Sequence, residues 1–341
     1  MNTLVSLGLS IRLLINLESL NMAESVGNVT KHRKAPVVIK DDEGYRLVYV
    51  PVISGMSLAH HYQHLLAHIA KNMGLNVTRM SLEGYFMKFA EDKIIKNHYP
   101  EVAGRVSKNR SQCENEREIV KACTVADVGG FLYTDGLVKR TSRFSFTYLM
   151  PAMDALGKGA VGVYPQLHVR YTPEAAKREQ ALIYVENASA LYTMTYLLEA
   201  SNISRLNACR ALGEDDDLGV EERVKRFKAS VSALAAMIGN TSFGAKRSRS
   251  MPHWEIESMI VTTVKSPAPF TPSPGHTPSF IEDTIARLRM QEKIINGFSW
   301  HAAYYDKDAG RSVEGAYKAG VPEEAIENAA SKAEEWLTQT S

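Results

Sequence analysis

The sequence predicts an α+β fold in which an antiparallel sheet is interrupted by a helical part and a projecting β-hairpin. Two patterns indicate this fold. Alternating apolar and polar residues predict long strands, most clearly at 5–19 and 255–264. Two amphipathic helices, predicted at 57–72 and 220–238, separate the strands into the order strand, helix, strand, strand, helix, strand.

Charge is concentrated locally, although the chain as a whole is close to neutral. The 341 residues include 40 Lys and Arg against 38 Asp and Glu, which gives a formal charge of +2. A polyanion would therefore have to meet local clusters of positive charge. Three short basic clusters without adjacent acids occur at 31–34, 139–143 and 246–249.

The remaining composition favours a reducing compartment and no bound metal or cofactor. Cys113, Cys123 and Cys209 are too few and too widely spaced to predict a zinc site or a disulfide framework. No apolar run approaches the roughly 20 residues that span a bilayer. We expect a cytoplasmic protein that does not bind a membrane.

The first quarter of the chain predicts a strand, a loop, a hairpin and a helix. The alternation over 5–19 predicts a strand with one buried face, followed by a loop over 20–36. A turn at 41–44 joins two short apolar runs into a hairpin. The helix predicted over 57–72 ends at Gly74, which suits the position after a helix C-terminus.

Histidines stack on one face of this first helix. His60, His64 and His68 are four residues apart, with His61 beside them. Two histidines at this spacing can bind a metal. No Glu, Asp or Cys completes a ligand set here, so we predict histidines that face solvent or a groove.

The middle of the chain predicts a helical insertion and a hairpin. Short helices are expected at 83–97 and 113–123, and an alternating strand at 144–150. Strands at 163–171 and 180–185, joined by a polar tip, predict a hairpin that projects from the core. A further strand over 188–198 is apolar on both faces, as a buried strand would be.

A loop rich in glycine and basic residues follows the second long helix. Residues 239–250 read GNTSFGAKRSRS and contain no acid. Small residues let a ligand approach the backbone N–H groups, and the fixed positive charges favour phosphate. A strand follows, then a proline-rich loop over 266–279, helices at 280–295 and 323–338, and a strand between them at 300–305.

The order of elements predicts a ferredoxin-like, or RNA-recognition-motif-like, palm. We expect the palm at 1–75, 124–150 and 186–265, with a helical insertion at 76–123 and a thumb-like hairpin at 151–185. The proline-rich loop and C-terminal helices occupy 266–341. With both long helices on one face, the other face of the sheet would be free for a long ligand. Basic loops rather than aromatic platforms favour contacts to a nucleic-acid backbone.

Seven ordered motifs resemble those of one family. They are NLESLN (16–21), ESVGNVTKHR (24–33), VPVISG (50–55), ADVGGF (126–131), RTSR (140–143), LHVR (167–170) and GAKRSR (244–249). Together they are similar to the archaeal DevR-type backbone subunits of type I-A CRISPR Cascade complexes, in the RAMP superfamily. The resemblance extends from about residue 6 to residue 297.

This resemblance implies a subunit without catalytic activity that holds guide RNA (crRNA). Copies would polymerise along the spacer as a helical filament with other Cascade subunits, and the guide would pair with target DNA. A guide is read by base pairing, so the protein needs contacts only to phosphate and sugar. The phosphate contacts expected are Lys31, Arg33, Lys139, Arg140, Arg143, Lys246, Arg247 and Arg249, beside Gly244 of the glycine-containing loop. Contacts to backbone or ribose are expected from Asn28, Thr30, Ser54 and Gly55, and His168 and Arg170 are expected on the thumb near the RNA or a neighbouring subunit.

Two other function classes stay open at this point. Members of the superfamily include metal-independent endoribonucleases that process the guide precursor, and His60 or His61 could act as the base. The sequence shows no paired acid or positioned nucleophile. A transcriptional regulator is the third class, and the chain lacks a helix-turn-helix with a basic recognition helix.

Overall fold

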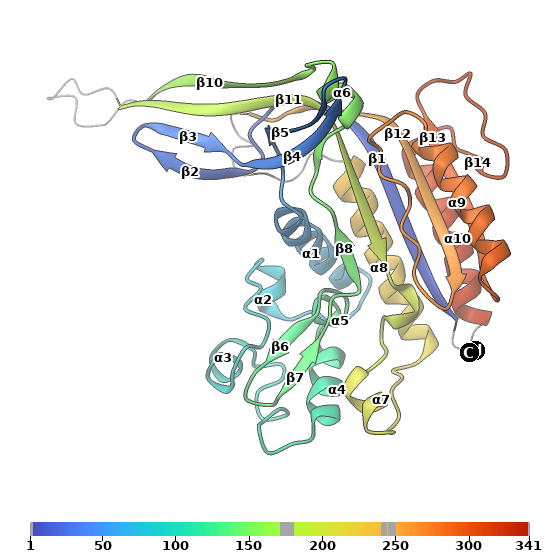
Figure 1. The fold of residues 1–341 in the computed structure, drawn as a ribbon. Coiled ribbons are helices and arrows are strands. Elements are labelled where there is room, and N and C mark those ends of the chain that lie inside the picture. Colours follow the sequence, from blue (N-terminus) through green and yellow to red (C-terminus); the bar gives the residue numbers. More distant parts are fainter. Residues whose placement is uncertain (1–2, 171–180, 240–243, 245–249, 340–341) are drawn as a thin grey trace, which may run out of the picture.

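A ten-stranded sheet forms the centre of the computed structural model (Figure 1). The structure describes residues 3–170, 181–239, 244 and 250–339. The strands follow the order β14-β13-β12-β1-β11-β3-β2, and β8, β9 and β10 also pair with β11. The fold is therefore α+β with a large mixed sheet, as predicted at that level.

The core of the sheet is antiparallel. Strand β1 (Leu4–Glu18) lies between β11 (Ala181–Leu198) and β12 (His253–Ser266), with Leu9 opposite both Tyr196 and Val261. Beyond β12 lie β13 (Ser299–Asp306) and the short parallel β14 (Tyr317–Lys318). On the other side, β8 (Phe144–Phe146) and β9 (Met150–Pro151) pair with β11.

Three helices cover one face of this sheet: α1 (Gly55–Asn72), α8 (Val220–Gly239) and α10 (Pro322–Gln339). The apolar side chains of β1 alternate along the strand and face these helices in the main hydrophobic core. A hydrogen bond joins the layers, because the Tyr62 hydroxyl on α1 lies 2.9 Å from that of Tyr196 and 3.1 Å from the Ser230 carbonyl on α8.

The second face of the sheet is covered, which corrects the prediction of an open face. The proline-rich segment after β12 crosses β1, where a Cβ on Gly8 would lie 2.6 Å from Pro272 Cδ. Helix α9 (Phe280–Ile294) packs on the same face of β12 and β13 through a second apolar cluster. Ser6, Ser10 and Arg12 of β1 are buried, and Arg12 is held by Asp154 at 2.8 Å and by the Gly275 carbonyl at 2.8 Å.

Hairpins project from one end of the sheet, with the short helix α6 (Met153–Gly157) at their base (Figure 1). The predicted loop over 20–36 instead contains β2 (Met22–Val26) and β3 (Val29–His32). The predicted hairpin follows as β4 (Lys34–Asp41) and β5 (Gly44–Pro51). The thumb-like hairpin is β10 (Val161–Arg170) with β11, which continues unbroken into the sheet instead of forming two strands.

A helical part extends from the opposite end. It comprises α2 (Arg79–Leu82), α3 (Asp92–His98), α4 (Gln112–Ala122) and α5 (Thr124–Gly129), together with the small hairpin of β6 (Phe131–Tyr133) and β7 (Val138–Arg140). The 3-10 turn η2 (Ala200–Asn202) and helix α7 (Asn207–Ala211) lie against it. Among the described ranges, no helix is long and apolar enough to cross a bilayer.

A disulfide joins α4 to α7 and corrects the expectation of free cysteines. Cys113 and Cys209 are 96 residues apart in sequence, but their Cα atoms lie 4.4 Å apart because α7 packs on α4. Cys123 is free and buried. The spacing of the cysteines could not reveal this pair, because tertiary packing creates it.

Reduction of this disulfide is expected to lower the free energy of unfolding by about 2–4 kcal/mol, because the bond restricts the unfolded chain. Urea unfolding with and without a thiol-free reductant measures the change. The double variant Cys113→Ser/Cys209→Ser is the control, and reductant should not alter its unfolding curve. Identical curves for the oxidised and reduced parent protein would contradict the stabilising role of the bond.

Candidate nucleic-acid interface

The buried carboxylate of Glu18 organises the base of the β2–β3 hairpin. Glu18 Oε1 lies 2.6 Å from His32 Nε2 and accepts a hydrogen bond of 2.8 Å from the Tyr192 hydroxyl, while Oε2 accepts one of 2.8 Å from the Leu20 N–H. His32 Nδ1 lies 2.9 Å from the Arg33 carbonyl. Both ring nitrogens of His32 thus face acceptors, which favours the imidazolium form.

The pKa of His32 is raised above its ordinary value of 6.5. Burial of the ring opposes this shift, but the hydrogen bond and negative charge of Glu18 outweigh the burial. The result is a buried ion pair between the end of β1 and the end of β3. It holds the hairpin in place relative to the sheet.

Asn21 connects this hairpin base to the start of α1. Its backbone carbonyl accepts a 2.9 Å hydrogen bond from the Arg33 N–H, and its side-chain oxygen accepts a 2.9 Å bond from the Ser54 N–H. Ser54 caps α1 by accepting from the Ser57 N–H at 3.2 Å. A Cβ on Gly55 would lie 2.8 Å from the Phe146 carbonyl, so glycine is required there. The N-terminus of an 18-residue helix is thereby fixed beside the hairpin, and such an end favours an anion.

Gly244 lies at the same place. Its φ of +116° is a conformation that glycine tolerates, and a Cβ there would lie 2.4 Å from Leu20 Cδ2. The neighbouring Lys246, Arg247 and Arg249, predicted to bind phosphate, lie outside the described residues. The chain nevertheless has to pass Leu20 at Gly244, next to the Glu18 network.

The predicted residues of the β2–β3 hairpin extend from its base at Arg33 to its turn at Asn28. Asn28 is exposed at its turn, and its carbonyl accepts a 2.8 Å bond from the Tyr184 N–H of β11. Thr30 is partly exposed, and Lys31 is 3.7 Å from Glu24, an exposed pair that constrains Lys31 little. The Nε of Arg33 is buried without a hydrogen-bond partner among the described residues.

Arg140 and Arg143 were predicted to contact phosphates, and the structure contradicts this. Arg140 is buried against Glu116 at 2.8 Å and against Asp127, and Arg143 is buried with its guanidinium 3.1 Å from Asn207 Oδ1. Desolvation lowers the pKa of Arg143 to about 10. These arginines hold the helical part to the sheet, and the sequence motif could not distinguish this role from surface binding.

The other predicted residues are dispersed. Lys139 is exposed on β7, on the hairpin of the helical part. His168 is partly exposed on β10, and Arg170 ends that strand opposite Ala181. Contacts through Leu20 and Asn21 bring Arg33, Ser54, Gly55 and Gly244 together. Asn28 and Thr30 lie instead against β11, whose neighbouring residue Ile183 pairs with His168, and Lys139 lies on β7 of the helical part.

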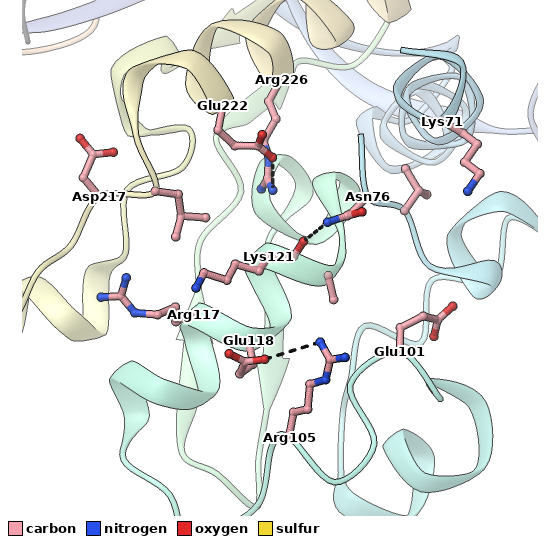
Figure 2. Close-up of a pocket in the computed structure, with 13 residues that line it drawn as sticks. Lys71, Asn76, Glu101, Arg105, Arg117, Glu118, Lys121, Asp217, Glu222 and Arg226 are labelled. Atoms are coloured by element: carbon pink, nitrogen blue, oxygen red, sulfur yellow. Dashed lines mark hydrogen bonds and ion pairs between the residues drawn. The ribbon is translucent and has the colours of Figure 1, made fainter. Parts of the chain in front are cut away.

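A separate cleft of about 940 Å³ lies between the end of α1, helix α4 and the start of α8 (Figure 2). Arg105 pairs with Glu118 at 4.0 Å, and Arg226 pairs with Glu222 at 2.7 Å. Carboxylates line this cleft together with the basic groups, and they would repel a phosphate chain. None of the predicted RNA contacts that the structure describes lines the cleft.

The histidine face of α1 is separate from the start of the helix. His60 is exposed with its ring edge-on to Phe86, at a centroid distance of 5.2 Å. Partial burial and the neighbouring His64 lower the pKa of His60. His64 and His68 contact each other through their Nε2 atoms at 3.1 Å.

Residues 9–285 match the sequence model of the family described as "CRISPR-associated negative auto-regulator DevR/Csa2". The chain belongs to the DevR/Csa2 family. It is 38% identical over 291 residues to the Saccharolobus solfataricus protein named "CRISPR-associated aCascade subunit Cas7/Csa2 2", which covers 84% of this chain and 88% of that protein. A second protein of that organism, "CRISPR-associated protein Cas7/Csa2 1", is 32% identical over 88% of this chain and 92% of its own length.

More distant similarities agree with this family assignment. A Methanocaldococcus jannaschii protein named "CRISPR-associated protein Cas7/Cst2/DevR" is 26% identical over 90% of this chain and 95% of its own length. A chain of a solved structure titled "CRISPR RNA-guided surveillance complex" shares the fold with a TM-score of 0.52 at 8% identity, covering 96% of this chain and 99% of that chain. At that identity the likeness concerns the fold alone.

Three residues of the candidate site were missed as functional candidates from sequence. Glu18, Asn21 and His32 lie inside the motifs that carried the resemblance, but no individual role was assigned to them. One feature of the sequence could have identified Glu18 as a candidate: it is the last residue of strand β1 and the one acidic residue in that strand. The sequence does not show that His32 is the partner of Glu18, because the two residues meet only when the β2–β3 hairpin forms.

His32→Gln is expected to lower the free energy of unfolding by about 3 kcal/mol at pH 6, because it leaves buried Glu18 without its cation. The folded-state pKa of His32 is raised, so its stabilisation is complete below the unfolded value of 6.5 and is lost as the pH rises through the folded value. The difference between parent and variant should therefore shrink as the pH rises. Urea unfolding at a series of pH values from 6 upward measures this difference. The control is His98→Gln, which changes an exposed histidine. A pH-independent difference would contradict the ion pair.

Asp127→Asn is expected to destabilise the protein by about 3–5 kcal/mol at neutral pH, since Arg140 and Arg226 would lose their shared buried counter-charge. Burial raises the pKa of Asp127, but the two arginines outweigh it and hold that pKa below its usual 3.8. The contribution is therefore present above that value and is lost as the pH falls through the lower folded value. Denaturant unfolding between neutral and acid pH checks this, and Asp215→Asn, whose side chain is 75% exposed, should have little effect.

Proposed function

We propose that this DevR/Csa2 protein is a guide RNA-binding backbone subunit of a CRISPR RNA-guided surveillance complex. A relative in this family is named as an aCascade subunit, and a chain of a solved surveillance complex has a similar fold. In this role several copies polymerise along the crRNA spacer with other Cascade subunits. The bound guide then pairs with target DNA.

One observation carries the proposed site: the N-terminus of α1, the β2–β3 hairpin and Gly244 converge around Leu20 and Asn21. Ser54 and Gly55 present a helix end that favours phosphate. Arg33, Lys31 and the basic residues after Gly244 supply charge, and Asn28 and Thr30 supply polar contacts. Lys139, His168 and Arg170 are proposed as peripheral contacts to the RNA or to a neighbouring subunit.

This site suits a ligand that is held without regard to its base sequence. Its groups are helix-end amides, guanidinium and ammonium groups, all of which recognise phosphate and sugar. The covered second face of the sheet removes the surface on which bases would otherwise lie. The RNA is therefore expected along the hairpin end of the sheet, with its bases free for pairing.

We also propose the finer description of the fold as an RNA-recognition-motif-like palm with a thumb. The strand order β12-β1-β11-β8, with α1 and α8 on one face, supports it. The proposed parts are the palm at 1–75, 124–150 and 186–265, the helical insertion at 76–123, the thumb at 151–185 and the C-terminal part at 266–341.

The triple variant Lys246→Ala/Arg247→Ala/Arg249→Ala should bind single-stranded RNA much more weakly while remaining folded. Each lost phosphate contact removes a slope of roughly −0.7 from the dependence of log affinity on log salt, so the slope should flatten by about 2. Filter binding of an RNA of random sequence over a salt series measures both quantities.

The matched control is Lys93→Ala/Lys96→Ala/Lys108→Ala, which removes the same charge from exposed positions of the helical part. It should leave the salt slope nearly unchanged. Equal slopes for the parent protein and the 246/247/249 variant would show that this loop does not hold phosphates.

An RNA cleavage assay distinguishes a guide-binding backbone subunit from a metal-independent endoribonuclease. A repeat-containing transcript incubated with the protein in EDTA is expected to stay intact, because a backbone subunit has to preserve its guide. Denaturing electrophoresis detects any product. If the parent protein cleaves the transcript and His60→Ala or His61→Ala does not, the chain is the endoribonuclease instead.

A further inference from the structure

The histidine face of α1 contains two side chains whose ring nitrogens meet. His64 and His68 are four residues apart, so they are neighbours on the surface of the helix. Their Nε2 atoms are 3.1 Å apart, and their ring centroids are 4.8 Å apart. His64 Nε2 also lies 3.2 Å from the carbonyl oxygen of Leu82, the last residue of α2, which is drawn beside α1 in Figure 1. Three polar atoms from two helices therefore gather around one ring nitrogen.

Protons satisfy this group of atoms incompletely. A neutral imidazole carries one N–H, and its other nitrogen has a lone pair. When His64 carries its proton on Nε2, that N–H can point straight at the Leu82 oxygen or at His68 Nε2, but not at both. When the proton is on Nδ1, the Leu82 oxygen receives no hydrogen bond from His64. A cation that accepts lone pairs from both nitrogens and from the oxygen satisfies all three atoms together.

The spacing of these atoms is that of ligands around one transition-metal ion. Bonds of about 2.0–2.1 Å from zinc to imidazole nitrogen, at angles of about 90–110°, place two ligand atoms about 2.8–3.4 Å apart. The 3.1 Å between the two Nε2 atoms and the 3.2 Å between His64 Nε2 and the Leu82 oxygen both lie within this range. The two imidazoles can therefore bind one ion with little rearrangement of the helix.

The surroundings leave this position open to an ion. His68 is exposed and His64 is partly exposed. Gly84 passes beside the His64 ring, and a Cβ there would lie 3.8 Å from Nε2, so the lack of a side chain leaves space at that nitrogen. Within the described ranges, no group of three or more His, Cys, Asp or Glu side chains is placed to hold a metal. The third ligand is therefore a backbone oxygen, which the sequence pattern could not reveal.

We propose that His64 and His68 form a binding site for a divalent transition-metal ion of the Zn²⁺, Ni²⁺ or Cu²⁺ class. Imidazole suits these ions, whereas Mg²⁺ and Ca²⁺ prefer oxygen ligands. The Leu82 oxygen is the third ligand, and water completes the coordination. The bound ion joins α1 to the end of α2 in the helical part. The site lies more than two helical turns beyond Gly55, so it is separate from the proposed RNA site.

Isothermal titration calorimetry of the full chain, without a histidine tag, tests the site. Reductant is omitted, and no thiol competes for the ion because Cys123 is buried and the other two cysteines form the disulfide. Zinc chloride is expected to bind with a stoichiometry near one, and magnesium chloride is expected not to bind. His64→Gln and His68→Gln should each weaken Zn²⁺ binding about tenfold or more, because one of two fixed donors is lost.

The matched controls are His60→Gln and His98→Gln, which change exposed histidines outside the pair. The ring of His60 lies against Phe86, at a centroid distance of 5.2 Å. Both controls keep the two donors, so their affinity for Zn²⁺ should stay within about twofold of the parent value. Urea unfolding in EDTA should be the same for His68→Gln as for the parent, which separates loss of the ligand from loss of the fold.

Electron paramagnetic resonance with one equivalent of Cu²⁺ identifies the ligands. The parent protein is expected to show coupling to two imidazole nitrogens, and His68→Gln is expected to show coupling to one at most. A parent protein that shows no saturable Zn²⁺ binding would overturn the proposal. Parent-like affinity and Cu²⁺ spectra in both His64→Gln and His68→Gln would overturn it as well, since the ion would then be held by other residues.

Discussion

The buried contact between Glu18 and His32 is the interaction on which the hairpin end of this protein depends. It lies where β1 leaves the sheet, and it joins the end of β1 to the end of β3 while Tyr192 and the Leu20 N–H satisfy the remaining acceptor sites. A buried charge pair of this kind is costly unless its hydrogen bonds are satisfied. The 2.6 Å contact with His32 and the hydrogen bonds from Tyr192 and Leu20 to Glu18 hold the segment from Leu20 to Asn21 beside the sheet. The start of α1 and Gly244 are both placed by that segment.

A second constraint is the burial of both faces of the central sheet. In an open RNA-recognition-motif-like sheet, the face opposite the helices can bind a ligand. Here the proline-rich segment crosses β1 at Gly8, its own Gly275 lies against Arg12 of β1 and Thr193 of β11, and α9 closes the remainder of that face. A glycine at each crossing is needed because a Cβ would collide with the neighbouring strand or segment. That face of the sheet is therefore closed to a long ligand, which leaves the end where the hairpins project as the proposed site.

Arg140 and Arg33 show that the charge of a motif does not by itself reveal whether its arginine is buried in the fold or lies at a candidate binding site. Arg140 belongs to a buried network with Asp127 and Glu116 that connects the helical part to the sheet. Arg33 lies at the hairpin base with an unpartnered Nε among the described residues. Both occur in short basic motifs of similar appearance. Only the acids that fold against Arg140, from helices α4 and α5, separate a structural arginine from one available to phosphate.

The sequence by itself determined the strand and helix periods and the family resemblance, and it singled out the motifs that contain Ser54, Gly55 and Gly244. These features depend on local periodicity and on residue types that tolerate special backbone geometry. Tertiary structure alone decided that 20–36 forms a hairpin, that the second sheet face is covered, that Cys113 meets Cys209, and that Arg140 and Arg143 are buried. Each of those outcomes requires segments far apart in sequence to meet, and local periodicity carries no information about which distant segments pack together.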